Sequence, residues 1–252
     1  MGTNERFEKL VKQYELKVDV ANQLDMVLSS CKVVLVCDDS GSMNNVIAED
    51  LGAAKKSTRW LELKKLAAKL IEFVTAINAE GLDIYFLNRG KLPGVTSASG
   101  LQDVFAENPY GNTPLLRTLK EVYYENVSIL GDRQLLIIVI TDGLPSDCRK
   151  LELFYTLADM TSMGNVHVSF AECTDVEEDM AYLDEWDNKI KNFDNTDDYR
   201  EELRRVRNCQ GPNFKFDYTD YVIKILLATF VKWYFNLDQP QYQSVSGCCT
   251  IL

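Results

Sequence analysis

The stretch VVLVCDDSGSMN, residues 33–44, joins an apolar run to a group of polar oxygens. The run VVLVC is typical of a strand that is buried on both faces of a parallel sheet. Two carboxylates and two hydroxyls then follow within five residues, from Asp38 to Ser42. The polar group therefore stands where a water-free strand ends.

Along the rest of the chain, apolar runs typical of strands alternate with segments of helical periodicity, as in an α/β domain. Strands are expected over residues 32–37, 82–88, 134–143 and 165–173, with a short last strand over 213–219. Helices are expected over residues 57–80, 115–126, 148–162, 176–208 and 219–236. This alternation predicts a doubly wound, mostly parallel central sheet with helices on both faces.

Three regions are expected along the chain. Residues 1–31 carry apolar positions at helical spacing and predict an N-terminal helical extension that packs on the main domain. The main domain is expected over residues 32–236, and residues 237–252 form a polar, flexible tail. Within the main domain, the acidic run DVEEDMAYLDEWD, residues 175–187, is interpreted as a solvated helix face, with a metal site as the minor reading.

Composition and charge indicate which classes of partner the protein could bind. The 252 residues carry a formal net charge of −11, which argues against nucleic acid and against electrostatic adhesion to anionic lipid. A cation is the more natural partner. Seven cysteines without metal-ligand spacing favour reduced thiols, and the N-terminus lacks the apolar run of a secretory signal, so a cytoplasmic location is expected.

The polar groups are expected to converge at one sheet edge, because ligands of open parallel sheets bind outside the carboxyl ends of the strands. The residues that would meet there are Asp38, Ser40 and Ser42 after the first strand, Thr113 in YGNTPL and Asp142 in TDG. Their carboxylate and hydroxyl oxygens suit a hard divalent cation, Mg²⁺ above all, with Mn²⁺ or Ca²⁺ as alternatives. Because the hydroxyls are neutral, the ion would keep enough positive charge to attract a carboxylate from a partner.

These motifs resemble those of the von Willebrand factor A family. DDSGS, GNTPL and ITDG match its Asp-x-Ser-x-Ser, threonine-loop and second-aspartate motifs in the same order, and the resemblance covers residues 32–236. It implies a metal-ion-dependent adhesion site (MIDAS). Ser40, Ser42 and Thr113 would act as ligands, Asp38 and Asp142 would bind directly or through water, and a partner's Asp or Glu would complete the shell.

Each motif also has a purely structural interpretation. DDSGSM alone could be a capped turn, and Thr113 alone could cap the helix that begins near Pro114. The neighbouring Asp39 lies outside the spacing motif and is expected to bond loop backbone or groups around the metal ligands, with ligation through water as the alternative.

The chain ends in GCCTIL, in which Cys249-Thr-Ile-Leu resembles a prenylation box with a geranylgeranyl-type final Leu. Since one lipid chain anchors only marginally, Cys248 is a candidate for palmitoylation. In a cell with prenyltransferases, this tail predicts attachment to the cytosolic face of a membrane. The alternative is a flexible tail with an accidental Cys-x-x-Leu ending.

Three functions remain open. The best supported is a Mg²⁺-dependent, non-enzymatic module that binds an acidic side chain of a partner protein. The alternatives are a Mg²⁺-dependent hydrolase or phosphatase that uses Asp38 or Asp39, and a scaffold with a vestigial metal site. Enzyme readings have little support, because His167 is the only histidine and lies in an expected strand, and because no phosphate-binding glycine loop is present.

Overall fold

A computed structural model of the chain describes residues 3–47, 57–174 and 177–239, and their core is a six-stranded sheet in the order β3-β2-β1-β4-β5-β6. The strands are β1 (Cys31–Cys37), β2 (Leu82–Phe86), β3 (Gly90–Val95), β4 (Gln134–Thr141), β5 (Val166–Glu172) and β6 (Phe193–Thr196). All neighbouring strands pair in parallel except β2 and β3. The predicted doubly wound, mostly parallel α/β fold is confirmed.

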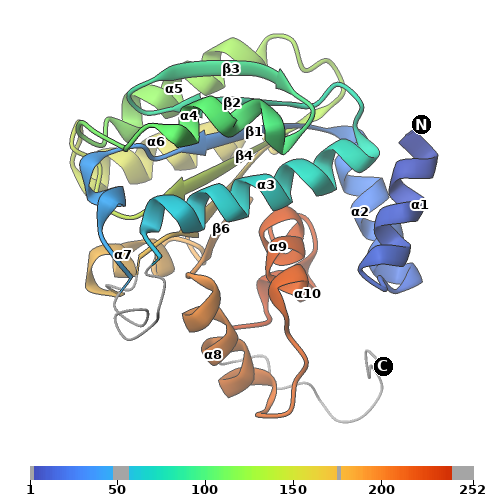
Figure 1. Cartoon of the computed structure of the whole chain (residues 1–252). Helices are drawn as coiled ribbons and strands as arrows, with labels where there is room; N and C mark the ends of the chain where they lie inside the picture. Colours follow the sequence, from blue (N-terminus) through green and yellow to red (C-terminus); the bar gives the residue numbers. More distant parts are fainter. Residues whose placement is uncertain (1–2, 48–56, 175–176, 240–252) are drawn as a thin grey trace.

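Helices cover both faces of this sheet (Figure 1). They are α1 (Thr3–Gln13), α2 (Val18–Ser30), α3 (Arg59–Ile77), α4 (Gln102–Ala106), α5 (Leu115–Val127), α6 (Lys150–Ser162), α7 (Glu177–Asp184), α8 (Tyr199–Gln210), α9 (Tyr218–Leu227) and α10 (Lys232–Phe235), with the short 3-10 turns η1 (Gly41–Asn44) and η3 (Ala98–Leu101). The apolar residues of α3 and α9 pack on one face, and those of α5 and α6 pack on the other.

The central strand β4 shows why the sheet needs both layers. Its side chains alternate between the two faces, and all of them from Leu135 to Ile140 are buried. Leu136, Ile138 and Ile140 join the core beneath α3, whereas Leu135, Ile137 and Val139 join the core beneath α5 and α6. A strand that is apolar on both faces is stable only between two layers of helices.

The order of the strands creates one switch point. From β1 the chain crosses over through α3 to β2 on one side, whereas β4, β5 and β6 extend the sheet on the other side. β1 and β4 are neighbours, with Cys37 opposite Ile140 at their carboxyl ends. Loops that leave two such strands diverge and open a crevice, which is the usual ligand site of this architecture.

Residues 3–30 form two helices that pack on the main core. Leu24 and Leu28 of α2 are completely buried in the same cluster as the strands. The Tyr14 hydroxyl donates to Glu72 of α3 at 2.8 Å, and its ring packs on Phe73. The N-terminal helices therefore extend the layer that α3 and α9 form.

The single helix expected over residues 176–208 is wrong. This region contains α7, then β6, then α8. β6 was not predicted, because three of its four buried residues are polar. They are Asp194, Asn195 and Thr196, whose side chains form hydrogen bonds inside the protein. A strand with so few apolar residues carries no apolar signature.

Expectations near the C-terminus are also corrected. Residues 213–217 form no strand, because Asp217 caps α9 and its carboxylate accepts from the backbone NH groups of Thr219 and Asp220. The helix expected over 219–236 is divided into α9 and α10.

The antiparallel strand β3 was not predicted, because its sequence GKLPGV combines two glycines with Pro93. It is mostly exposed and lies at the edge of the sheet beside β2.

Among the described residues, no helix is long and apolar enough to cross a membrane. The cysteines singled out for lipidation, Cys248 and Cys249, lie outside the described residues. Within them, Cys31, Cys37, Cys148, Cys173 and Cys209 are free thiols.

Candidate metal centre

Asp38 directly follows β1 and fixes the loop that begins there. One carboxylate oxygen accepts from the Ser40 NH at 2.9 Å, and the other accepts from the Thr141 hydroxyl at 2.6 Å. The side chain is completely buried, and burial raises its pKa to about 6, with a further increase from the nearby charge of Asp142. Asp38 is thus a rigid, water-free carboxylate at the switch point.

The hydroxyls of this loop reach Asp142, the residue that directly follows β4. Ser42 Oγ donates to Asp142 Oδ1 at 2.8 Å, across 100 positions of sequence, and lies 3.1 Å from Ser40 Oγ. Asp142 and Ser40 are buried, whereas Ser42 is exposed. The structure therefore joins a buried carboxylate to an accessible hydroxyl.

The loop of Thr113 adjoins this group through its backbone. The Gly41 NH donates to the Gly111 carbonyl at 3.0 Å, and Thr113 exchanges two hydrogen bonds with Ser146. Gly111 has φ +88°, and a Cβ there would lie 2.6 Å from the Asn88 side chain. Thr113 is half-buried at the edge of the site, but in the part of the chain that the structure describes its hydroxyl does not join the Ser40–Ser42–Asp142 group.

Asp39 holds the surrounding loops, as the sequence predicts. Its Oδ1 accepts from both the backbone NH and the side-chain amide of Asn88, at 2.8 and 3.1 Å. Its carbonyl accepts from the Tyr110 NH at 2.8 Å, and Arg89 lies 3.5 Å from Oδ2. The carboxylate of Asp39 thus positions the loop after β2, and its carbonyl positions the loop after α4.

Arg59 is the site residue that sequence reasoning missed. Its Nη1 lies 2.9 Å from Asp142 Oδ2, and both side chains are nearly inaccessible to water, at 8% and 0% exposure. Arg59 begins α3, where a cation opposes the helix dipole. A basic residue in a first turn needs a compensating anion, and that is the signal that could have revealed the pair.

The donor chemistry of the site fits a hard divalent ion. The described groups are carboxylate and hydroxyl oxygens without sulfur or imidazole, and Ser42 faces solvent. Ser40, Ser42, Asp38 and Asp142 would hold the ion, with Thr113 beside them. Arg59 is a positive group already bound to one oxygen of Asp142.

A second group of carboxylates lies at the ends of β5 and β6. Oxygens of Glu172, Asp184 and Asp197 lie within 4.8 Å of one another. Arg205 contacts Asp184 at 2.8 Å and Asp197 at 2.9 Å, and the Asn195 amide donates to Glu172 and Asp184 at 2.8 Å each. Burial raises the pKa of Glu172 to about 8 and that of Asp197 to about 9. We call these three residues the acidic cluster.

The run at residues 175–187 is therefore only in part a solvated face. Leu183 and Trp186 are buried in the core beneath the sheet, and Asp184 belongs to the acidic cluster. Glu185 is exposed and pairs with Lys189 four residues later, as expected for a solvated face.

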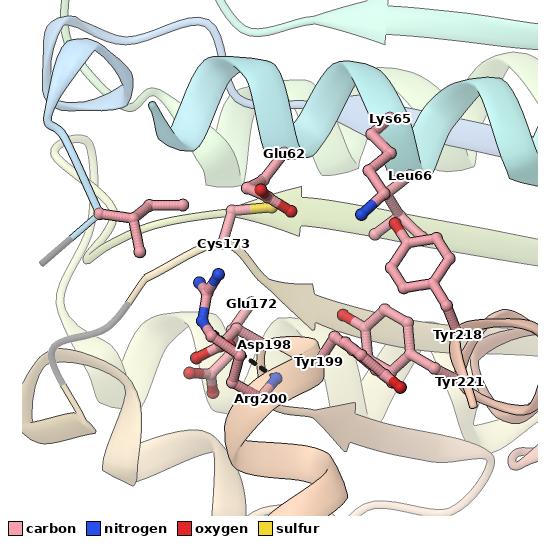
Figure 2. Close-up of a pocket in the computed structure, with 11 residues that line it drawn as sticks. Glu62, Lys65, Leu66, Glu172, Cys173, Asp198, Tyr199, Arg200, Tyr218 and Tyr221 are labelled. Atoms are coloured by element: carbon pink, nitrogen blue, oxygen red, sulfur yellow. Dashed lines mark hydrogen bonds and ion pairs between the residues drawn. The ribbon is translucent and has the colours of Figure 1, made fainter. Parts of the chain in front are cut away.

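Beside the acidic cluster, a cavity of about 80 Å³ lies between α3, β5, α8 and α9 (Figure 2). Figure 2 shows Glu62 and Lys65 of α3 on one side and Tyr199, Arg200 and Tyr221 on the other. The volume accommodates a few water molecules, well below the roughly 300 Å³ at which small-molecule sites begin. This cavity does not fit a metabolite.

His167 has a structural role, as predicted. It lies on β5 with Nδ1 3.2 Å from the Thr229 carbonyl, and its ring stacks on Phe230 with the centroids 3.8 Å apart. Burial lowers its pKa to about 4. The only imidazole of the chain is therefore neutral and packed beneath the sheet.

Comparison with known proteins gives little beyond this geometry. No protein-family model and no curated protein matches the chain. Among solved structures, it is similar to a von Willebrand factor type A protein from Catenulispora acidiphila, at 16% identity and a TM-score of 0.41. The match covers 67% of this chain and 38% of that protein, so this chain spans well under half of its length. At this level of similarity the function must be argued from the site itself.

Proposed function

We propose that the chain is a non-enzymatic protein-interaction module that binds Mg²⁺ at the carboxyl ends of β1 and β4 and, with it, an acidic side chain of a partner. The observation that carries the proposal is the hydrogen bond from Ser42 to Asp142 at 2.8 Å, with Ser40 Oγ 3.1 Å from Ser42 Oγ. Oxygen atoms that could bind a metal ion come together there from two segments distant in sequence, and one of them belongs to the exposed Ser42.

The chain's own residues divide the work in this proposal. Asp39 is held by Asn88 and fixes the loop after β2, whereas the Ser40 and Ser42 hydroxyls would supply neutral ligands beside the carboxylates of Asp38 and Asp142. The ion would supply a positive charge with a coordination position for a carboxylate from outside. Neutral ligands leave more of that charge uncompensated than carboxylates would.

The hydrogen bonds disfavour the hydrolase alternative. Both oxygens of Asp38 accept hydrogen bonds from the protein, and Asp39 is bound to Asn88 and Arg89. Neither carboxylate is presented as a nucleophile to a substrate. His167 packs against Thr229 and Phe230 instead of this site, so it supplies no base there.

Calorimetry with Mg²⁺ and Mn²⁺ on the full chain tests the metal site. We expect Ser42→Ala to weaken binding by about tenfold or more, since outer-shell changes alone cost 10–100-fold at metal sites. Ser29→Ala is the matched control, because Ser29 is also exposed and its hydroxyl donates to the Met26 carbonyl of its own helix, α2. No binding by the unaltered protein, or equal binding by Ser42→Ala, would contradict the site.

Partner capture tests the interaction. We expect proteins retained with Mg²⁺ to be released by EDTA and to be lost with Ser42→Ala. Retention in EDTA would instead support the scaffold with a vestigial metal site.

We also propose that the C-terminus tethers this module to the cytosolic face of a membrane through a prenyl group on Cys249 and a palmitoyl group on Cys248. The sequence GCCTIL supports this proposal, since two lipids anchor far more stably than one. Fractionation of eukaryotic cells that express the chain with and without Cys249→Ser tests it. Equal membrane fractions would contradict prenyl anchoring.

A further inference from the structure

Arg59 lies where α3 meets the candidate metal centre. Its Nη1 donates to Asp142 Oδ2 at 2.9 Å, while Ser42 donates to Asp142 Oδ1 at 2.8 Å. Both oxygens of Asp142 are therefore engaged, one by a neutral ligand group and one by a cation. The metal centre and the guanidinium share a single carboxylate.

The backbone holds Arg59 firmly in this position. Its NH donates to the Asn45 carbonyl at 3.1 Å, and the preceding Thr58 forms a β-bridge with Val46. Thr58 also caps α3 by accepting from the Leu61 NH. The start of α3 is thus tied to the segment that follows the Ser40–Ser42 loop, which fixes the backbone position from which the Arg59 side chain reaches Asp142.

The charge of Arg59 affects how strongly the site would bind a cation. Arg59 adds one positive charge beside the carboxylates of Asp38 and Asp142, so the site is more positive by one unit with Arg59 than without it. A divalent ion bound there would be repelled by this charge, and an acidic group from outside would offset it. Because the pair is almost inaccessible to water, solvent screens these charges weakly.

We infer that Arg59 is a built-in counter-cation of the metal centre, which weakens binding of the ion alone and strengthens binding of an acidic group once the ion is present. The inference rests on the proposed function, since it concerns the same ion. It makes the two ligands cooperative: the carboxylate of the partner offsets the excess charge, and by linkage each ligand raises the affinity of the other.

Mn²⁺ binding to the full chain, measured by calorimetry with and without acetate as the acidic probe, tests the inference. We expect Arg59→Gln to bind Mn²⁺ alone about tenfold more tightly, a typical size for coupling between ligand sites. The tightening that acetate produces should be smaller in Arg59→Gln than in the unaltered protein. Arg59→Lys keeps the charge and should behave like the unaltered protein.

Lys32→Gln is the matched control for net charge. Lys32 lies near the start of β1 and pairs with Asp83, away from the carboxyl ends of the strands. Its loss should leave Mn²⁺ affinity unchanged. If Arg59→Gln fails to fold, Arg59→Met provides a second neutral variant, and the guanidinium NMR signal of Arg59 in the unaltered protein should shift on Mg²⁺ addition while that of Arg205 does not.

The outcomes separate the inference from the proposed function. If the unaltered protein binds Mn²⁺ but Arg59→Gln binds it no more tightly, or if Arg59→Lys binds as tightly as Arg59→Gln, the counter-cation role is wrong and the metal site stands. An Arg59 NMR signal that does not respond to Mg²⁺ also overturns the role. If neither protein binds Mn²⁺, the metal site fails and the inference fails with it.

Discussion

The candidate metal centre and the acidic cluster both place buried carboxylates beside an arginine, but they differ in what completes them. At the metal centre, neutral hydroxyls lie beside the carboxylates and one of them, Ser42, is exposed. In the acidic cluster, the neutral neighbour is the Asn195 amide, which donates hydrogen bonds to two carboxylates. The number of carboxylates alone therefore does not identify a metal site.

The two regions also differ in how their charge is neutralised. Arg205 bridges Asp184 and Asp197, and burial raises the pKa of Glu172 to about 8, so protons and one guanidinium suffice there. The metal centre has its own guanidinium, but its accessible hydroxyl leaves a place for an ion. A change in the acidic cluster should therefore leave Mn²⁺ binding at the metal centre unaffected, whereas a change in the metal centre should weaken it.

The largest effect is expected from Asp142→Ala. It removes one partner of a buried ion pair, which typically costs about 3–5 kcal/mol of unfolding free energy, and it removes Mn²⁺ binding. Urea unfolding and calorimetry measure the two effects. Retention of Mn²⁺ affinity by the folded variant would show that the ion does not depend on Asp142.

The second-largest effect is expected on the pH dependence of the unfolding free energy, which Glu172→Gln should change. Glu172 has a folded pKa of about 8, above its usual value, so between about pH 4.5 and 8 the folded protein holds a proton that the unfolded chain has released. The unfolding free energy should fall as pH rises through this window, by up to about 1.4 kcal/mol per pH unit from this group. Glu172→Gln should lose that part of the slope and keep its Mn²⁺ affinity.

Urea unfolding at pH 5 and pH 8 measures the slope. Glu185→Gln is the control, since Glu185 is exposed and should leave the slope unchanged. Equal slopes for the unaltered protein and Glu172→Gln would mean that Glu172 is ionised inside the folded protein.

The smallest effect on stability is expected from Thr113→Ala. The hydrogen bonds that Thr113 makes to Ser146 come from its backbone, so the unfolding free energy should change by less than about 0.5 kcal/mol. Mn²⁺ affinity should nevertheless fall, by about tenfold, if the Thr113 hydroxyl belongs to the metal centre. Unchanged affinity would restrict the centre to the loops after β1 and β4.

The sequence predicted the central part of the molecule well, because β1 and β4 are apolar on both faces and end in polar residues. Parallel strands that neighbour each other bring Asp38 and Asp142 to one edge, so the contact between the loops after β1 and β4 could be expected from the fold class. Arg59 could not be found in this way, because its contact spans 83 positions and depends on how α3 begins.

The periphery was less predictable for a related reason. Asp194 and Asn195 of β6 are buried but polar, and only their partners in the folded protein make that burial tolerable. Residue patterns report local preferences, whereas β6 and the acidic cluster depend on partners that are distant in sequence.

The edge strand β3 has a consequence for the behaviour of the protein at high concentration. Pro93 offers no NH to a further strand, and Lys91 places a charge on the same edge, where it pairs with Glu125. Both features discourage a second molecule from adding to the sheet. β3 was not predicted because of its glycines and proline. We expect the same residues to oppose aggregation through intermolecular strand pairing.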